Sequence, residues 1–128
     1  MVKLIIAGDF CMHDRMQHFS SNDIVAAMSS VVASIQESDY AIANLECAVF
    51  DGEHKPITKD GPHLHNTSES IKALTTLGFN GVTLANNHFA DYGLEAVNET
   101  LSLLKQNDIY KHAYQKDRKT DLGVDQQI

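Results

Sequence analysis

The stretch that decides the fold is residues 81–88, GVTLANNH, in which an apolar run ends in two amides and a histidine. Short apolar runs rich in β-branched residues and closed by turn-forming residues are typical of buried strands. Two earlier stretches have the same character, so the sequence predicts three strands, over Val2–Ala7, Tyr40–Leu45 and Gly81–Ala85. All three are followed closely by acidic or amide side chains.

Segments with helical periodicity separate these strands. Apolar residues recur at helical spacing from Ile24 to Ile35, behind a cap at Ser21 or Asn22, and predict an amphipathic helix. After the third strand, another helix is predicted whose apolar face carries Leu94, Val97, Leu101 and Leu104. The chain therefore alternates between strand and helix.

A long segment follows the second strand. Residues 47–65 contain both prolines and predict a loop, which at this length is usually functional or mobile. Asn66 and Glu69 resemble a capping box, and the short helix that they would begin ends at Gly78. A strand, a loop and a helix thus precede the third strand.

This alternation predicts an α/β protein of repeated βαβ units with a parallel sheet, because right-handed crossovers bring successive strands side by side. A weak strand is predicted at residues 109–110, and the polar residues after it predict an unstructured tail. We therefore expect a folded part over residues 1–110 and a tail over residues 111–128.

Composition narrows the classes of function. The chain has 128 residues, is 43% hydrophobic and carries a formal net charge of −7, which indicates one globular domain and argues against a nucleic-acid surface. The N-terminal apolar run is too short for a signal peptide, and no segment is long enough to span a membrane. Cys11 and Cys47 form no C-x-x-C pair, so we expect a reduced, cytoplasmic chain with packing thiols, a redox pair being the lesser alternative.

Polar side chains follow all three predicted strands at the point where each strand ends. Because the carboxyl ends of parallel strands meet at one edge of a sheet, we expect these side chains to lie close together. Carboxylate and amide oxygens suit Mn, Mg or Fe, and imidazole extends the choice to Zn, so a divalent-metal site follows as a hypothesis. The residues that carry it are Asp9, Asn44, Glu46, Asn86, Asn87, His88 and Asp91.

Each of these residues also has a structural interpretation. Asp9 or Asn86 alone would be an ordinary strand-ending or turn residue. Glu46 is harder to explain in this way, since a carboxylate directly after an apolar strand would be partly buried and would need a partner. His88 alone would more often pack or face solvent, and His13 and His65 are weaker loop candidates.

Taken together, the motifs resemble a known family. They are Gly8-Asp9, Ala43–Glu46, Gly61-Pro62, Leu84–His88 and Asp91–Gly93. In this order they resemble the bacterial capsule synthesis protein family, of the CapA type linked to poly-γ-glutamate biosynthesis, over residues 1–110. That family looks like a branch of the calcineurin-like metallophosphatases. The resemblance implies the first half of an α/β/β/α sandwich.

The resemblance also implies roles for individual residues. Asp9, Glu46 and Asn87 correspond to metal ligands, and His88 corresponds to a catalytic histidine near the leaving group. The supporting or substrate-side candidates are Asn44, Asn86, Asp91, His13 and His65. In related enzymes two divalent metals, here Mn, Fe, Zn or Mg, clamp a phosphoester while the histidine assists the departing oxygen. Small molecules or anionic polymers are the implied substrates.

Two departures from the family keep a second hypothesis open. Cys11 stands where many metallophosphatases have the histidine of a D-x-H pair, and complete members are longer than this chain. The alternative is a truncated, catalytically incomplete fragment or a non-catalytic polymer-binding module.

A half sandwich would leave an apolar sheet face uncovered, so we also expect self-association. Relatives are often exported or membrane-anchored. A nucleotide-binding domain is disfavoured because Gly8-Asp9 lacks a glycine-rich phosphate loop.

Overall fold

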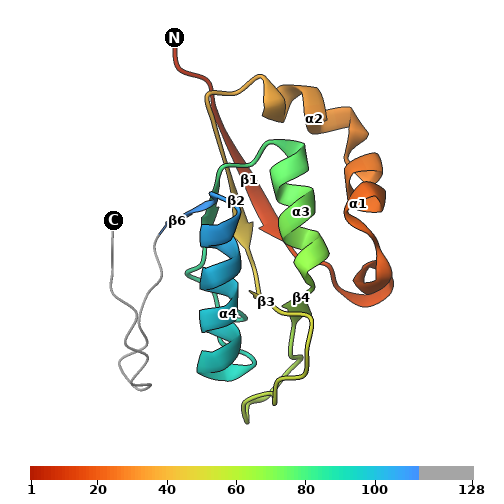
Figure 1. Cartoon of the computed structure of the whole chain (residues 1–128), viewed down its shortest axis with the longest axis vertical. Coiled ribbons are helices and arrows are strands. Elements are labelled where there is room, and N and C mark those ends of the chain that lie inside the picture. Colours follow the sequence, from red (N-terminus) through yellow and green to blue (C-terminus); the bar gives the residue numbers. More distant parts are fainter. Residues whose placement is uncertain (113–128) are drawn as a thin grey trace.

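The computed structural model describes residues 1–112, and these form a parallel four-stranded sheet with helices along one side (Figure 1). The sheet order is β1-β2-β5-β6, and all neighbouring strands are parallel. The strands are β1 (Leu4–Phe10), β2 (Tyr40–Leu45), β5 (Gly81–Thr83) and β6 (Tyr110–His112). The predicted α/β class with repeated βαβ units is confirmed.

The remaining elements connect these strands. A 3₁₀ helix η1 (Asp14–His18) and the helices α1 (Ser21–Ala27) and α2 (Ser29–Gln36) lie between β1 and β2. A two-stranded pair and one helix precede β5, namely β3 (Ala48–Val49), β4 (His65–Asn66) and α3 (Ser68–Leu77). Helix α4 (Gly93–Gln106) leads to β6. Within residues 1–112, every helix is too short or too polar to cross a bilayer.

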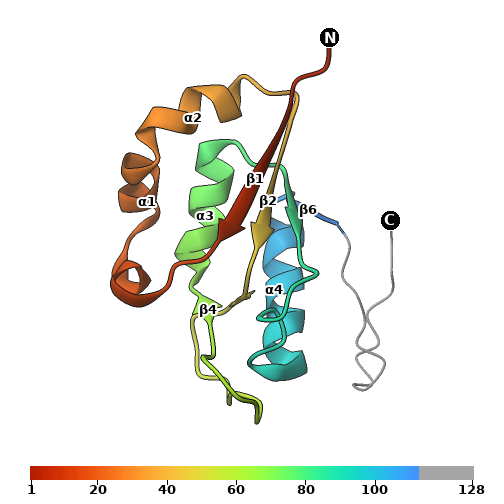
Figure 2. The same cartoon turned by 180° about the vertical axis from the view of Figure 1, so that it is seen from behind.

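The helices gather on one face of the sheet. The chain passes from β1 to β2 to β5 to β6 and so moves in one direction across the sheet. Right-handed crossovers that all step the same way place their helices on the same side. Figures 1 and 2 show this arrangement, since α3 and α4 lie in front of the strands in one view and behind them in the other.

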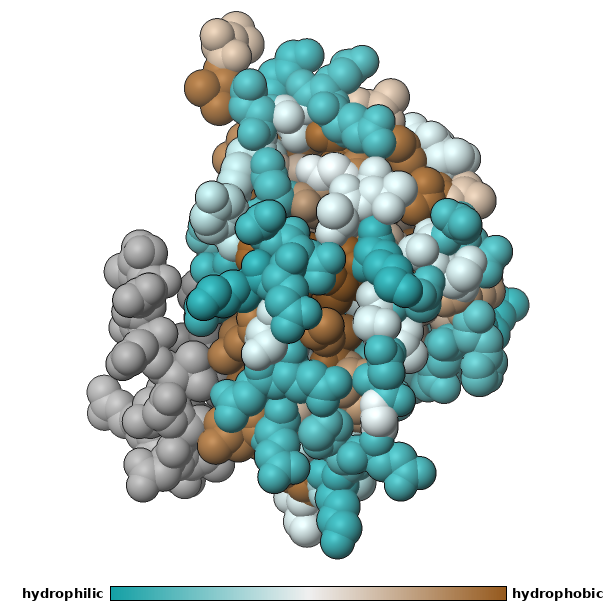
Figure 3. All heavy atoms as spheres, in the orientation of Figure 1, coloured by the Kyte–Doolittle hydropathy of each residue, from teal (hydrophilic) through white to brown (hydrophobic). Residues whose placement is uncertain are grey.

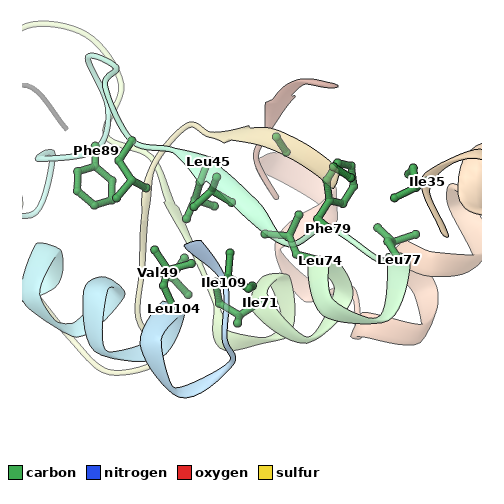
Figure 4. Packing of buried hydrophobic residues seen from close by; sticks show 14 of the residues in the cluster. Ile35, Leu45, Val49, Ile71, Leu74, Leu77, Phe79, Phe89, Leu104 and Ile109 are labelled. Carbon is green, nitrogen blue, oxygen red and sulfur yellow. The ribbon is translucent and has the colours of Figure 1, made fainter. Parts of the chain in front are cut away.

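The hydrophobic core fills the space between the sheet and the helices (Figure 4). In β2, Ala41, Ala43 and Leu45 are buried, whereas the alternate residues are only partly covered. Helix α3 contributes Leu74 and Leu77 from the opposite side of this core. Fully burying one such leucine stabilises a fold by about 1.5–3 kcal/mol, so this one-sided core is what holds the sheet edge in place.

The other face of the sheet is exposed. The β-ladder register pairs Leu4 with Tyr40 and Ile6 with Ile42, which puts these side chains on the face opposite the core. Leu4 is 55% exposed, Ile6 is 74% exposed and Tyr110 of β6 is 66% exposed. The helix side, by contrast, shows mostly hydrophilic residues at its surface (Figure 3). The sheet therefore leaves apolar side chains in contact with solvent.

The predicted helix over residues 24–35 is two helices. Met28 breaks it, with φ −98° and ψ 12°, and separates α1 from α2. The cap is Ser20 rather than Ser21 or Asn22, because the Ser20 and Asp23 side chains each accept a hydrogen bond from the other's backbone N–H. The predicted helical period was correct in phase, since Ile24 and Ile35 are both buried.

The predicted capping box at Asn66 and Glu69 is wrong. Thr67 is the N-cap of α3 and makes no side-chain cap bond, while Asn66 belongs to β4 and pairs with Val49. The Asn66 side chain is buried and accepts a hydrogen bond from the backbone N–H of Met12 at 2.6 Å. Glu69 also makes a long-range contact, since it accepts a hydrogen bond from the backbone N–H of Ser21. Asn66 and Glu69 are thus both used in tertiary contacts and not as a capping box.

Several boundaries also differ. Strand β1 runs to Phe10, so Gly8 and Asp9 lie inside the strand instead of after it. Gly78 does end α3 in the left-handed conformation, with φ 100°. In α4, Leu94 is 39% exposed and is not part of the buried face. Strand β6 includes residues 111–112, which were expected in the tail, and the rest of the predicted tail, residues 113–128, lies outside the described residues.

Candidate functional site

A chain of hydrogen bonds links the carboxyl ends of three strands. The Asn44 side-chain amide donates to Asp9 Oδ1 at 2.7 Å, and the Asn86 amide donates to Asn44 Oδ1 at 3.3 Å and to the Leu45 carbonyl at 2.9 Å. Asn86 Oδ1 in turn accepts the backbone N–H of His88 at 3.1 Å. The structure therefore connects residues that are up to 79 positions apart in the sequence, from Asp9 to His88.

An irregularity in β1 sets the position of Asp9. Ile6 pairs with Ile42 and Asp9 pairs with Asn44, so three steps along β1 match two steps along β2. In a regular strand, residues three apart point to opposite faces, and the extra residue restores Asp9 to the face of Ile6. The Thr83 hydroxyl of β5 also donates to Asn44 Oδ1, at 2.9 Å. Asp9, Asn44 and Thr83 consequently form a polar row across the uncovered face.

His88 is oriented by a buried carboxylate. Its Nδ1 lies 2.8 Å from Asp91 Oδ2, and the same oxygen accepts the backbone N–H of Leu64 at 2.8 Å. Lys59 forms an ion pair with the other oxygen, Oδ1. The tautomer that this arrangement assigns to neutral His88 carries its proton on Nδ1 and leaves the Nε2 lone pair available. Among residues 1–112, Nε2 has no hydrogen-bond partner.

The charge on Asp91 is maintained against burial. The side chain is only 1% exposed, and burial by itself raises the pKa of a carboxyl group. Hydrogen bonds from Lys59, His88 and the Leu64 N–H, together with the positive charge of Lys59, outweigh burial and lower the pKa of Asp91 below its ordinary value. Asp91 is therefore an anion that can fix the histidine and the lysine at once.

Two cysteines lie beside this chain of hydrogen bonds. Cys11 follows β1, Cys47 follows Glu46, and their Sγ atoms are 3.4 Å apart. The hydrogen bond from Cys47 lowers the pKa of Cys11 despite burial and the nearby carboxylates of Glu46 and Asp9. The same hydrogen bond, and to a smaller extent burial, raises the pKa of Cys47. Cys47 also forms a parallel bridge with His88, which connects the pair to the histidine segment.

The side chains at this edge include oxygen donors of the kind that bind divalent cations. The Glu46 carboxylate is half-buried and accepts no hydrogen bond from residues 1–112, so a cation would satisfy it. Asp9 would add a second carboxylate to such a site, and Asn87, which is exposed, would add an amide oxygen. These are hard ligands of the type that Mn and Mg prefer, and His88 Nε2 adds a nitrogen. Within residues 1–112, no three His, Cys, Asp or Glu side chains already stand close enough to hold an ion.

Among residues 1–112, the side chains of Glu46 and Asn87 make no hydrogen bond to this chain, and His13 and His65 also lie outside it. His13 is exposed and precedes η1. His65 stacks on Phe50 at a ring-centroid distance of 4.5 Å and meets the edge of Tyr92, and its burial lowers its pKa. Neither histidine contacts Asp9, Asn44, Asn86 or His88 through any hydrogen bond within the described part of the chain. His65 belongs instead to an aromatic cluster beside β4.

Sequence reasoning missed Lys59 and Thr83. Lys59 lies in the long segment after β3, and only the fold reveals that it reaches Asp91. A lysine in a loop that faces a buried aspartate carries no local sequence signal. Thr83 lies in the predicted strand Gly81–Ala85, but its place in the polar row depends on the register of β2 and β5, which pairs it with Asn44 and which the sequence did not predict.

The fold and this edge define the class of protein. The chain is an α/β protein with a parallel sheet and polar residues at its carboxyl ends, consistent with the first, βαβ half of a metallophosphatase-like domain. It belongs to the bacterial capsule synthesis protein family, PGA_cap, whose sequence model matches residues 3–121.

Two curated relatives are similar to part of the chain. One is the capsule biosynthesis protein CapA of Bacillus anthracis, 32% identical over 77 residues, which are 59% of this chain and 19% of the relative. The other is the PGA biosynthesis protein CapA of Bacillus subtilis (strain 168), 38% identical over 72 residues, 55% of this chain and 19% of the relative. The matched region therefore spans about a fifth of the length of these relatives.

Proposed function

We propose that this chain contributes a divalent-cation site to capsule or poly-γ-glutamate biosynthesis, and that the site belongs to a metal-dependent phosphoester hydrolase. Asp9, Glu46 and Asn87 would hold the cation, with His88 beside it. The observation that carries the proposal is the chain of hydrogen bonds from Asp9 through Asn44 and Asn86 to His88, which joins the ends of three strands. Such an edge is where ligands bind in parallel α/β sheets.

The chemistry of His88 supports the proposal. Asp91 Oδ2 accepts a hydrogen bond from His88 Nδ1 at 2.8 Å, which fixes the ring and leaves Nε2 facing away from the carboxylate. A protonated Nε2 could donate to a departing oxygen, and a neutral one could bind a cation. Asp91 would stabilise the imidazolium in the first case, because its own pKa is held low and it remains an anion.

Lys59 adds a positive charge beside His88 and Asp91. Its Nζ lies 3.4 Å from His88 Nδ1 and pairs with Asp91, and its side chain is 22% exposed. It would limit the negative potential around an anionic substrate without replacing the histidine. A bound divalent cation would supply Lewis-acid polarisation of a phosphoryl oxygen. Asn44 and Asn86 would orient the surrounding oxygens through their existing hydrogen bonds.

The names of the relatives support the biological setting. Both are described as proteins of capsule or PGA biosynthesis, and the proposal transfers that setting to this chain. A chain with a formal net charge of −7 repels an anionic polymer on average, so a cation and Lys59 at the sheet edge would provide the local attraction. We propose an anionic polymer or a small phosphoester as the substrate.

The test is cation binding by the full chain. Calorimetry with Mn and Zn should give stoichiometric binding, weakened at least about tenfold in Glu46→Ala and in His88→Ala. Glu37→Ala is the matched control, because Glu37 is an exposed carboxylate at the end of α2 and should leave binding unchanged. Circular dichroism must show that every variant is folded.

The outcomes distinguish the two hypotheses that the sequence left open, an enzyme and a non-catalytic module. Cation binding together with metal-dependent hydrolysis of a phosphoester supports the enzyme. Binding without hydrolysis supports a non-catalytic module of the same family. A folded chain that binds neither Mn nor Zn, or that loses as much affinity in Glu37→Ala as in Glu46→Ala, contradicts the proposed site.

A further inference from the structure

Cys11 and Cys47 are two free thiols in direct contact. Their Sγ atoms are 3.4 Å apart, and the residues are 36 positions apart in the sequence. Cys11 is half-buried, whereas Cys47 is completely buried. One thiol of the pair is therefore accessible to reagents in solution, and the other lies directly behind it.

The backbone at this point suits a disulfide. Phe10 pairs with Leu45 across the β1–β2 ladder, and the Glu46 N–H donates to the Phe10 carbonyl at 3.3 Å. The two backbone segments are therefore still adjacent where the cysteines occur. Strands in a sheet are about 4.8 Å apart, and a disulfide spans Cα atoms about 4.4–6.8 Å apart. From 3.4 Å, the Sγ atoms need to approach by about 1.4 Å to reach bonding distance.

We propose that Cys11 and Cys47 are a modification site that forms a reversible intramolecular disulfide when the chain meets a small-molecule disulfide. Cys11 attacks the oxidant first because it is the accessible thiol, and it forms a mixed disulfide while one thiol of the reagent leaves. Cys47 then attacks Cys11 Sγ, loses its proton to the departing group and releases the second thiol. The two cysteines are oxidised, and one small disulfide is reduced to two thiols.

The bond would lie beside the sheet edge. Asp9 is two residues before Cys11, Glu46 immediately precedes Cys47, and Cys47 bridges to His88. The disulfide would tie the ends of β1 and β2 together and restrict the backbone on which these side chains stand. Formation of the bond requires no cation, so its test is independent of the proposed function.

The test uses the full chain and oxidised glutathione as the oxidant. Intact mass should fall by the two hydrogens lost, free thiols should fall from two to none, and peptide mapping should recover Cys11 linked to Cys47 in a monomer. The reaction should be at least about 100-fold faster than disulfide formation between separate chains of the single-cysteine variants, because the thiols are already in contact. A reducing agent should reverse it.

Two variants establish the order of the steps. Cys47→Ala should stop at a stable glutathione adduct on Cys11, while Cys11→Ala should leave the buried Cys47 unmodified as long as the chain is folded. The native chain alone decides the proposal if a variant fails to fold. A persistent glutathione adduct on native Cys11, a disulfide between two chains, or two free thiols after prolonged exposure of the folded chain would overturn it.

Discussion

Asp91 is a buried carboxylate whose charge is compensated from several directions. Lys59 and His88 contact its two oxygens, and the Leu64 N–H donates to one of them. Such a group is costly to bury without partners, and the partners in turn depend on its charge. Asp91 therefore holds the long segment after β3 against the turn that contains His88.

Asp91→Asn should destabilise the chain by about 2 kcal/mol at neutral pH, because Lys59 loses its counter-charge and two charge-assisted hydrogen bonds weaken. The folded-state pKa of Asp91 is lowered, so its contribution is fully present above the unfolded pKa of about 3.9 and is lost as the pH falls through the folded pKa. The difference between native and variant should consequently shrink below about pH 4.

Urea denaturation across this pH range measures the difference. Asp60→Asn is the control, since Asp60 is an exposed aspartate one position from Lys59 and should change stability little at any pH. A destabilisation by Asp91→Asn that stays constant from pH 7 to the acid limit would show that charge is not its cause.

Glycine at position 81 makes room for contacts between strands. A Cβ there would lie 2.8 Å from Tyr40 Oη and 3.1 Å from His112 Nε2. These two atoms are themselves hydrogen-bonded at 2.7 Å, so the Tyr40 side chain of β2 passes over Gly81 of β5 to reach β6. The three elements are thus tied together on the uncovered face by one hydrogen bond.

Gly81→Ala should cost about 1 kcal/mol, because the new methyl displaces Tyr40 and His112 and breaks their hydrogen bond. In a Tyr40→Phe background the hydrogen bond is already absent, so the same substitution should cost less, and a double-mutant cycle measures that coupling. Gly8→Ala is the control, since nothing lies within 4 Å of a Cβ at that position. Equal costs at positions 8 and 81 would contradict this account.

The elements that the sequence predicted well are those with a strong local period. The strand Tyr40–Leu45 was predicted with its observed bounds, and the predicted alternation of strands and helices correctly indicated a parallel sheet. The break at Met28 escaped prediction because α1 and α2 keep the same hydrophobic phase on either side of it. Strands β3 and β4 have two residues each, too few to show any alternation.

The site was predictable to a similar extent. Strand ends indicated Asp9, Asn44, Asn86 and His88, and the structure joins these four by hydrogen bonds. The bulge that turns Asp9 onto the face of Asn44 has no signature beyond Gly8, and the link from Lys59 to Asp91 depends on how a long loop folds back. Local patterns predict which residues end strands, whereas loop contacts depend on tertiary structure.

At the scale of the whole molecule, the sheet formed by residues 1–112 has a core on one side only among these residues. Leu4, Ile6 and Tyr110 are more than half exposed on the other side, next to the polar row of Asp9 and Asn44. Exposed apolar faces of this kind favour association, since burying one isoleucine side chain is worth about 1.5–3 kcal/mol. We therefore predict that the isolated chain self-associates through this face.

Ile6→Lys should weaken that association about tenfold or more, because it removes an apolar side chain and brings like charges together in a symmetric pair. Val31→Lys is the matched control, since Val31 of α2 is 42% exposed but lies on the helix side. Sedimentation velocity and light scattering over a range of concentrations measure the association. A native chain that remains a monomer at every concentration and melts cooperatively would refute the prediction, and equal weakening by both variants would place the contact on another surface.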